Sequence, residues 1–212
     1  MFGTHDLVLF IVSGLLLNMM PGPDSLLIMT RSATQGWRAG SSAALGIGTG
    51  TLVHIVAAAL GLSAILATSA TAFMLVKLAG AAYLLYVGVQ LLLSKTKAAQ
   101  VNNEEKPLAR LGHGQIFLQG FMTNVLNPKV ALFFLAFVPQ FIDHDAASKP
   151  LAFIALGLVF NINGMLWCHF LAISTAAASH KIRISTGFVK WLNRLMGGIF
   201  VSFGLKLALS KQ

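Results

Sequence analysis

The sequence predicts an all-α membrane protein with six transmembrane helices, arranged as two inverted repeats of three helices. Composition gives the class, because 56% of the 212 residues are hydrophobic and only 10% are charged. Soluble domains carry about a quarter charged residues. The apolar residues also form six stretches, and proline interrupts the first and the fourth of them, which indicates an internal repeat.

A transmembrane helix needs roughly 20 consecutive apolar residues. The six predicted spans are residues 7–30, 41–66, 73–93, 116–141, 151–178 and 190–209. Only the weakly polar sequence TSAT at residues 68–71 separates the second span from the third. The longest polar segment, residues 94–114, is the predicted cytoplasmic linker. It divides the chain into a first repeat at residues 1–93 and a second repeat at residues 115–212.

The net charge of +9 comes from basic residues at the ends of the spans and requires no nucleic-acid partner. Ten Lys and Arg residues fall on one predicted side of the bilayer, and only Lys149 and Lys211 fall on the other. Cytoplasmic loops carry the excess of Lys and Arg, so both termini are predicted to face outward. The N-terminal residues lack the pattern of a cleaved signal peptide, and the single Cys168 excludes an internal disulfide.

The first span breaks at Pro21-Gly22-Pro23 and resumes after Asp24. Proline lacks an N–H and clashes with the preceding turn, so a regular helix cannot continue there. Such a break at membrane depth is tolerated only where the backbone is buried in protein or lines a cavity. An acid inside the membrane costs roughly 2.5–3.5 kcal/mol and is therefore a functional candidate. The alternative is a simple proline kink with Asp24 leaning toward the interface near Arg31.

The fourth span repeats this pattern with the opposite charge. Asn18-x-x-Pro21-Gly22-Pro23 matches Asn124-x-x-Asn127-Pro128, and alignment on the prolines brings Asp24 to Lys129. Three spans in each half would invert the second repeat, which is a known plan of secondary transporters.

Interrupted helices in matching positions indicate a transporter binding site, and the chemistry suits a zwitterion. The N-terminus of a half-helix attracts a carboxylate, whereas Asp24 and freed carbonyls can accept hydrogen bonds from an ammonium group. Lys129 could pair with Asp24 in the empty site; the alternative is a lysine that snorkels to the interface. The candidate substrate-binding residues are Asn18, Pro21, Gly22, Pro23, Asp24, Asn124, Asn127, Pro128 and Lys129.

Other polar residues inside the spans have two interpretations. His54 is, after Asp24, the second candidate for proton coupling, because histidine changes charge near neutral pH. A buried, hydrogen-bonded neutral histidine explains its position equally well. Asn161 and Asn163 are expected to bond neighbouring helices rather than to line a cavity.

The sequence argues against several other classes. We expect no metal site and no cofactor, because no acidic or histidine cluster falls in the spans. We expect no enzyme, because neither a nucleophile–base pair nor a His-Glu-x-x-His motif is present. Two alternatives stay open, namely the same fold exporting another small solute or metal ion, and a non-transport structural protein of the membrane. The second would not require two matched breaks with opposite charges.

An ordered set of motifs resembles the lysine exporter (LysE/RhtB-type) family of bacterial amino-acid efflux transporters, and within it the threonine/homoserine/leucine branch. The set is PGPD at 21–24, GWRAG at 36–40, GIGTGTLVH at 46–54, LAGAAYLLYVG at 78–88 and GFMTNVLNPKVALFFLAFVPQF at 120–141. The resemblance covers nearly the whole chain. The family's motif residues map to Pro21, Gly22, Pro23, Asn127, Pro128 and Lys129.

This resemblance implies six spans in the bacterial cytoplasmic (inner) membrane and an antiporter that exchanges amino acids for protons. We expect a neutral amino acid to bind from the cytoplasm between the two broken helices, with its carboxylate at Lys129 and its ammonium at Asp24. Asp24 is the preferred proton carrier. The sequence leaves open which amino acid is carried, the coupling stoichiometry and whether the chain forms a homo-oligomer.

Overall fold

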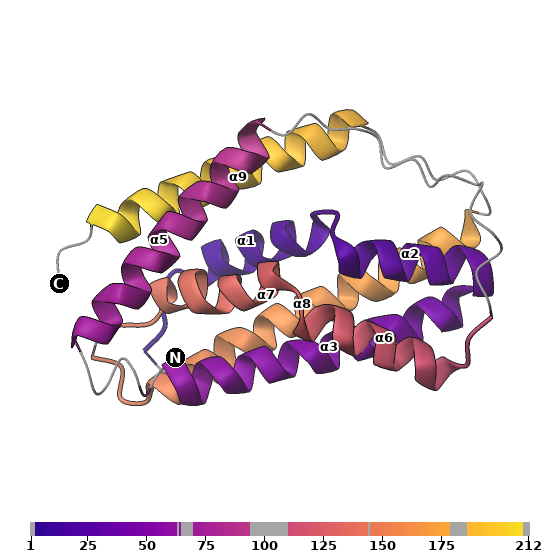
Figure 1. The fold of residues 1–212 in the computed structure, drawn as a ribbon, viewed down its shortest axis with the longest axis horizontal. Helices are drawn as coiled ribbons and strands as arrows, with labels where there is room; N and C mark the ends of the chain where they lie inside the picture. The colour runs from indigo at the N-terminus through magenta and orange to yellow at the C-terminus, as the bar shows by residue number, and fades with distance from the viewer. Residues whose placement is uncertain are drawn as a thin grey trace.

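The computed structural model describes residues 3–62, 64, 70–93, 110–143, 145–178 and 186–209. This part of the chain is helical, apart from turns and one isolated bridge between Thr4 and Ile142 (Figure 1). The helices are α1 (Leu7–Met19), α2 (Pro23–Gln35), α3 (Trp37–Ala57), η1 (Ala58–Leu62), α5 (Ala70–Leu93), α6 (His113–Val125), α7 (Pro128–Leu132), η2 (Phe133–Phe137), η3 (Val138–Phe141), α8 (Lys149–Ala177) and α9 (Thr186–Leu209).

Both predicted breaks are present. Helices α1 and α2 meet at an angle of 55°, and α6 meets the helical segment Pro128–Phe141 at 46°. Each second half-helix begins at a proline, Pro23 in α2 and Pro128 in α7. Proline suits this first position because its missing N–H would have no partner there and its φ is already helical. The prolines therefore end one half-helix and start the next.

The helices confirm the class of an all-helical membrane protein. Helix α3 with η1 (Trp37–Leu62) and helix α8 are each long and apolar enough to cross a bilayer, and each bent pair passes the same test as one span. The described residues thus contain two such spans, or up to four with the bent pairs, together with a shorter apolar helix at Leu78–Leu93. Six spans stay a prediction. Residues 65–69 and 94–109, with the predicted span boundary and most of the linker, lie outside the described residues.

Helix α3 begins at Trp37, four residues before the apolar span that the sequence predicts from about residue 41. Gly36 ends α2 and starts α3 with a φ of +85°, a left-handed conformation that glycine adopts without steric cost. The turn between the two helices is therefore a single residue, and polar residues in GWRAG are already helical.

The largest core cluster is aromatic and surrounds the π-helical turn η2. Phe133 stacks on Phe160 of α8 with ring centroids 4.4 Å apart, and Phe10 of α1 contacts both Phe133 and Phe141. Phe137 meets Phe203 of α9 edge to face at 4.8 Å. Offset and edge-to-face pairs of this kind add about 0.5–1.5 kcal/mol each to the burial of the rings. The cluster ties the second broken helix to α1, α8 and α9.

Elsewhere glycine allows helices to approach closely. A Cβ at Gly46 of α3 would overlap the Phe117 carbonyl of α6, and a Cβ at Gly120 would overlap the Ala43 carbonyl in return. Small residues bring helix backbones together in this way in membranes. Helices α5 and α9 also approach closely, because Gly88 of α5 and Gly197 of α9 each lie against the backbone carbonyl of the other.

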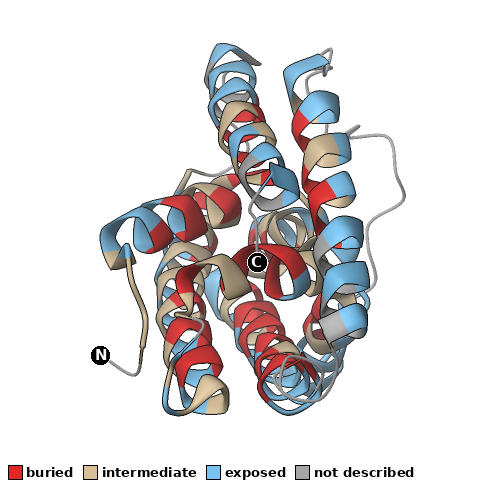
Figure 2. Ribbon diagram, turned by 90° about the vertical axis from the view of Figure 1, so that its left-hand side faces the viewer, coloured by how far each residue is buried: buried red, intermediate tan, exposed pale blue. Residues whose placement is uncertain are grey.

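The outer surface is apolar. Figure 2 shows the buried residues where helices face one another and the exposed residues on the outward faces, above all on α5 and α9. Large apolar side chains are among the most exposed, including Leu75, Leu93, Trp191 and Leu209. Such a continuous apolar exterior would be a liability in a soluble monomer but suits contact with lipid.

One end of the bundle is basic. The end of α2 meets the start of α6 there, because Gln35 Nε2 donates to the Leu111 carbonyl at 2.9 Å. Ser42 Oγ lies 2.8 Å from His113 Nδ1 at the same end. Three of the four described arginines, Arg31, Arg38 and Arg110, belong to this region.

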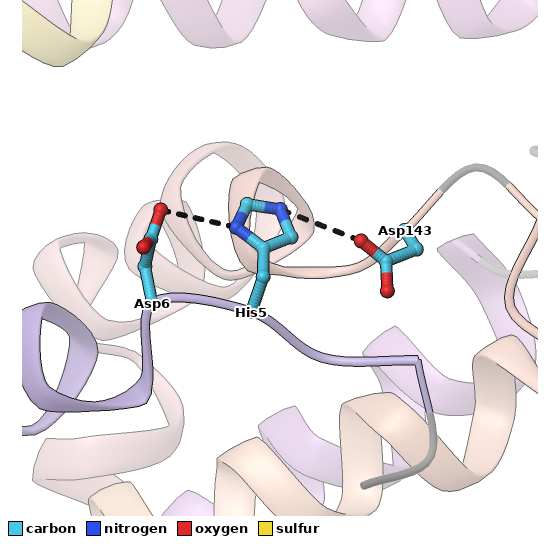
Figure 3. A network of polar contacts seen from close by, with 3 residues as sticks. All are labelled: His5, Asp6 and Asp143. Carbon is cyan, nitrogen blue, oxygen red and sulfur yellow. Dashed lines mark hydrogen bonds and ion pairs between the residues drawn. The ribbon is translucent and has the colours of Figure 1, made fainter.

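The opposite end is acidic. There the N-terminal segment is tied to the turn that precedes α8, since His5 N donates to the Phe141 carbonyl at 3.1 Å and Asp143 N donates to the Gly3 carbonyl at 2.8 Å. The His5 ring lies between two carboxylates, with Nδ1 3.1 Å from Asp6 Oδ2 and Nε2 3.9 Å from Asp143 Oδ1 (Figure 3). His5 is 40% exposed, so these ion pairs contribute little to stability.

The close approach of α3 and α6 can be tested by adding one methyl group. Gly120→Ala should lower the free energy of unfolding by about 1–3 kcal/mol, because the new Cβ meets a backbone carbonyl that cannot move aside. Gly114→Ala in the same helix is the matched control, since no heavy atom lies within 4 Å of its added Cβ. Thermal unfolding in detergent compares the two, and equal midpoints would contradict the packing described.

Candidate functional site

A small internal cavity lies between the two helix breaks. Its volume is about 30 Å³, which is room for about one water molecule. Residues from both broken helices and from α3 and α8 line it: Leu17, Asn18, Asp24, Ser25, Ile47, Gly48, Thr51, Asn124, Lys129, Val130, Phe160, Asn161, Gly164, Met165 and Cys168.

Asp24 forms the acidic side of the cavity. It occupies the first turn of α2, where the positive end of the helix dipole stabilises a carboxylate. Its Oδ2 accepts hydrogen bonds from Asn124 Nδ2 at 2.9 Å and Asn127 Nδ2 at 3.2 Å. Its Oδ1 is buried and has no hydrogen-bond partner in the structure. One oxygen is therefore held by the second broken helix, and the other is available to a donor in the cavity.

The two asparagines are themselves fixed in place. Asn127 caps α7, because its Oδ1 accepts from Lys129 N at 3.0 Å. The Oδ1 of Asn124 accepts from the Thr51 hydroxyl at 3.3 Å. Each side chain thus uses its oxygen elsewhere and turns its NH₂ group toward Asp24. Both are almost completely buried, at 1% and 3% exposure, so their geometry is well constrained.

Lys129 forms the basic side of the cavity. Its Nζ donates to the carbonyls of Leu17 at 3.3 Å and Met20 at 3.5 Å, at the C-terminal end of α1. The negative end of the α1 dipole stabilises the ammonium group there. A Cβ at Gly22 would lie 3.4 Å from Nζ, so glycine leaves room for the lysine at the break.

Asp24 and Lys129 do not pair in this structure, a point that the sequence left open. No ion pair within 4.0 Å joins these two described residues. The physical reason is that each already has partners, since α1 carbonyls hold the lysine and asparagine amides hold the aspartate. Arg31, toward which the kink alternative directs Asp24, donates to Gln119 Oε1 at 3.0 Å.

The nine residues predicted to bind substrate divide into two groups. Asn18, Asp24, Asn124 and Lys129 line the cavity, and Asn127 contacts Asp24 from outside the lining. The Asn18 Nδ2 is buried without a hydrogen-bond partner. The others shape the backbone at the two breaks: Pro21, Gly22, Pro23 and Pro128.

His54 lies one contact away from the cavity. Its Nε2 is 3.1 Å from the Asn124 carbonyl, and its ring stacks on Phe134 at a centroid distance of 6.3 Å. It is absent from the lining, so any influence on Asp24 would pass through Asn124. This agrees with the interpretation of a hydrogen-bonded, partly buried histidine.

One face of α8 is the part of the site that the sequence did not reveal. Asn161, expected to bond neighbouring helices, lines the cavity, whereas Asn163 does not. Gly164, Met165 and Cys168 join Asn161 there. The spacing of three, four and seven residues places all four on one side of a helix. The spacing is present in the sequence. In a span of mostly apolar residues, however, it does not distinguish the face toward the cavity from the face toward lipid.

The site combines an acceptor and a donor of opposite charge in one closed cavity. Such an arrangement can bind a small zwitterion, with its ammonium at Asp24 and its carboxylate at Lys129. Among the described residues no group of three His, Cys, Asp or Glu side chains is placed to hold a metal ion.

Comparisons with known proteins identify the family. A family model described as LysE type translocator matches residues 15–211. Membrane protein YrhP of Bacillus subtilis is 32% identical over 97% of this chain and 100% of its own length. The leucine efflux proteins of Salmonella typhimurium and Salmonella choleraesuis are 29% identical over 98% of this chain and 96% of theirs. No solved structure matches. The chain therefore belongs to the LysE-type translocator family and is a transporter rather than an enzyme.

Proposed function

We propose that this protein exports a neutral amino acid from the cytoplasm in exchange for protons. The observation that carries the proposal is the pair of opposite charges, Asp24 and Lys129, at two helix breaks that face one cavity. Each charge is held by backbone or amide groups rather than by the other, so both can meet a zwitterion. The relatives named leucine efflux protein support an amino-acid cargo.

The substrate ammonium binds the free Oδ1 of Asp24, and the substrate carboxylate draws Lys129 Nζ away from the α1 carbonyls. Asn18 offers its unpartnered amide to the same carboxylate. The α2 N-terminus, which no side chain caps, adds a positive dipole. A cavity of about 30 Å³ is too small for an amino acid, so the cavity must widen before a substrate can bind.

Six spans in two inverted repeats provide the motion. The packing supports this plan in part, because α3 contacts α8 and α5 contacts α9, the pairs of helices that the repeat would relate. The two bent pairs then correspond as well, and Asp24 of one meets Asn124 and Asn127 of the other. Rocking of one repeat against the other would expose the site alternately.

The charge distribution supports an orientation in the bacterial inner membrane. Arginines gather at the end where α2 meets α6, and Asp6 and Asp143 lie at the other end. Under the positive-inside bias the basic end is cytoplasmic, which puts the start of α1 outside.

Asp24 is the proposed proton carrier, and its neutral variant separates binding from coupling. Asp24→Asn should abolish the response of transport to a pH gradient while leaving amino-acid exchange, because the amide keeps the shape but cannot titrate. Flux into proteoliposomes with and without a gradient measures this, and Asp143→Asn at the outer turn is the matched control. Gradient-driven flux that survives in Asp24→Asn would remove Asp24 from this role.

Lys129 is the proposed carboxylate ligand. Lys129→Met should weaken apparent substrate affinity by about 10–150-fold, the equivalent of one charged hydrogen bond of about 1.5–3 kcal/mol. Lys149→Met, at the far end of α8, should leave affinity unchanged. Competition of unlabelled against labelled leucine in exchange assays gives both values, and equal affinities in the two variants would return Lys129 to a structural role.

Cys168 reports occupancy of the site, because it lines the cavity and is the only cysteine in the sequence. A membrane-impermeant thiol reagent should label it slowly, since it is reached only when the site opens, and saturating substrate should slow labelling at least about tenfold. Mass spectrometry of the protein in oriented vesicles follows the reaction. If no amino acid in a test panel protects Cys168 or moves across the membrane, that result would favour another solute or a non-transport role.

A further inference from the structure

The cavity is lined by polar and by apolar side chains, and Met165 is one of the apolar ones. Asp24 and Lys129 account for the charged groups of an amino acid but not for its side chain. We propose that Met165 of α8 occupies the space that the substrate's side chain takes, and that it sets the largest side chain the carrier accepts. This inference rests on the proposed function, because it names the specificity-determining residue of that same site.

Gly48 of α3 and Met165 of α8 both line the cavity and contact each other. A Cβ built on Gly48 would overlap Met165 Sδ and would lie 3.3 Å from Met165 Cγ and 3.5 Å from Asn161 Oδ1. The thioether therefore lies directly against the α3 backbone at Gly48. A larger residue at position 48 would require the methionine side chain to move.

Met165 is also the apolar lining residue with the fewest constraints. Leu17, Val130 and Phe160 belong to the aromatic core cluster, and Phe160 is further fixed by its stacking on Phe133. Ile47 belongs to the second core cluster, which forms around α3. Met165 is a member of neither cluster. When a substrate enters, Met165 is thus the side chain that can move without breaking the core.

The chemistry of methionine suits this role. It is unbranched, has three rotatable bonds and a polarisable sulfur, and so adapts to irregular apolar shapes. When the methionine swings aside, it leaves an apolar space beside Gly48. No carboxylate besides Asp24 lines the cavity, so a cationic side chain would stay unpaired there. The space therefore fits an uncharged aliphatic side chain of about the size of methionine itself.

Substitution of Met165 should change which amino acids are carried rather than whether any are carried. In Met165→Ala the ratio of L-phenylalanine to L-valine transport, measured by competition in proteoliposomes, should rise about tenfold or more, since each buried methylene alters discrimination by about 10-fold or more. Leu166→Ala is the matched control on the same helix, because Leu166 is 68% exposed and points away from the site. Its ratio should equal that of the wild type.

A second pair of variants tests the contact itself. Gly48→Ala should slow exchange of every amino acid, because its Cβ takes the present place of Met165 Sδ and pushes the methionine into the space that a substrate's side chain would enter. The double variant Gly48→Ala/Met165→Ala should recover exchange of L-valine, because the methionine is no longer there to be displaced. Gly61→Ala in the adjoining η1 turn is the control for glycine replacement, since nothing lies within 4 Å of its added Cβ.

The outcomes distinguish a failure of the Met165 inference from a failure of the proposed function. A raised ratio in Met165→Ala together with rescue in the double variant supports the inference. Wild-type flux with an unchanged ratio in Met165→Ala, or a double variant no faster than Gly48→Ala, overturns it and leaves the proposed function intact. Absence of flux of any amino acid in the folded wild type contradicts the proposed function and the inference together.

Discussion

The structure depends on one reversal of backbone polarity inside a single span. Where α1 ends, its last carbonyls present partial negative charge, and where α2 begins a few residues later, its N–H groups present partial positive charge. Lys129 takes the first position and Asp24 takes the second. Two full charges can therefore lie in one apolar interior without touching, because each is solvated by a helix end. In a continuous helix neither end would exist, and the same charges would have to neutralise each other or leave the membrane.

The remaining architecture keeps this break rigid. The Phe133–Phe160 stack fixes the second broken helix against α8, while the glycine contacts bring α3 within reach of Asn124. Asn124 and Asn127 then transmit that rigidity to Asp24 through their amides. The polar groups of the site are thus held in two ways, by apolar packing of the helices that carry them and by hydrogen bonds to one another. The lipid-facing residues on α5 and α9 make no contacts that hold the site. Large side chains such as Leu93 can therefore be exposed on these helices.

The sequence predicted the parts of the site that depend on local rules. Proline fixes φ and removes a donor wherever it occurs, so the breaks at Pro23 and Pro128 follow from the residues alone. Asp24 beside the first break could likewise be identified as a functional candidate, because it is an acid inside a span. The partners of Lys129 could not be predicted in this way, because carbonyls are present in every residue and only the packing selects two of them. Met165 was missed for a related reason. In an apolar span the periodicity that distinguishes core from surface in soluble proteins is nearly absent, so cavity-facing and lipid-facing residues look alike.

The bonds from Asn124 and Asn127 to Asp24 have a consequence for motion. They join the first broken helix to the second, and they are charge-assisted, so they are roughly twice as strong while Asp24 is ionised as when it is neutral. If the two broken helices move apart, these bonds are among the contacts that must break. In the transport cycle proposed above, a proton on Asp24 would weaken them directly, and a substrate ammonium group at Oδ1 would compete for the same charge. Substrate and proton would then act on the same two hydrogen bonds, and the free energy of binding either of them would lower the barrier to the movement that carries it.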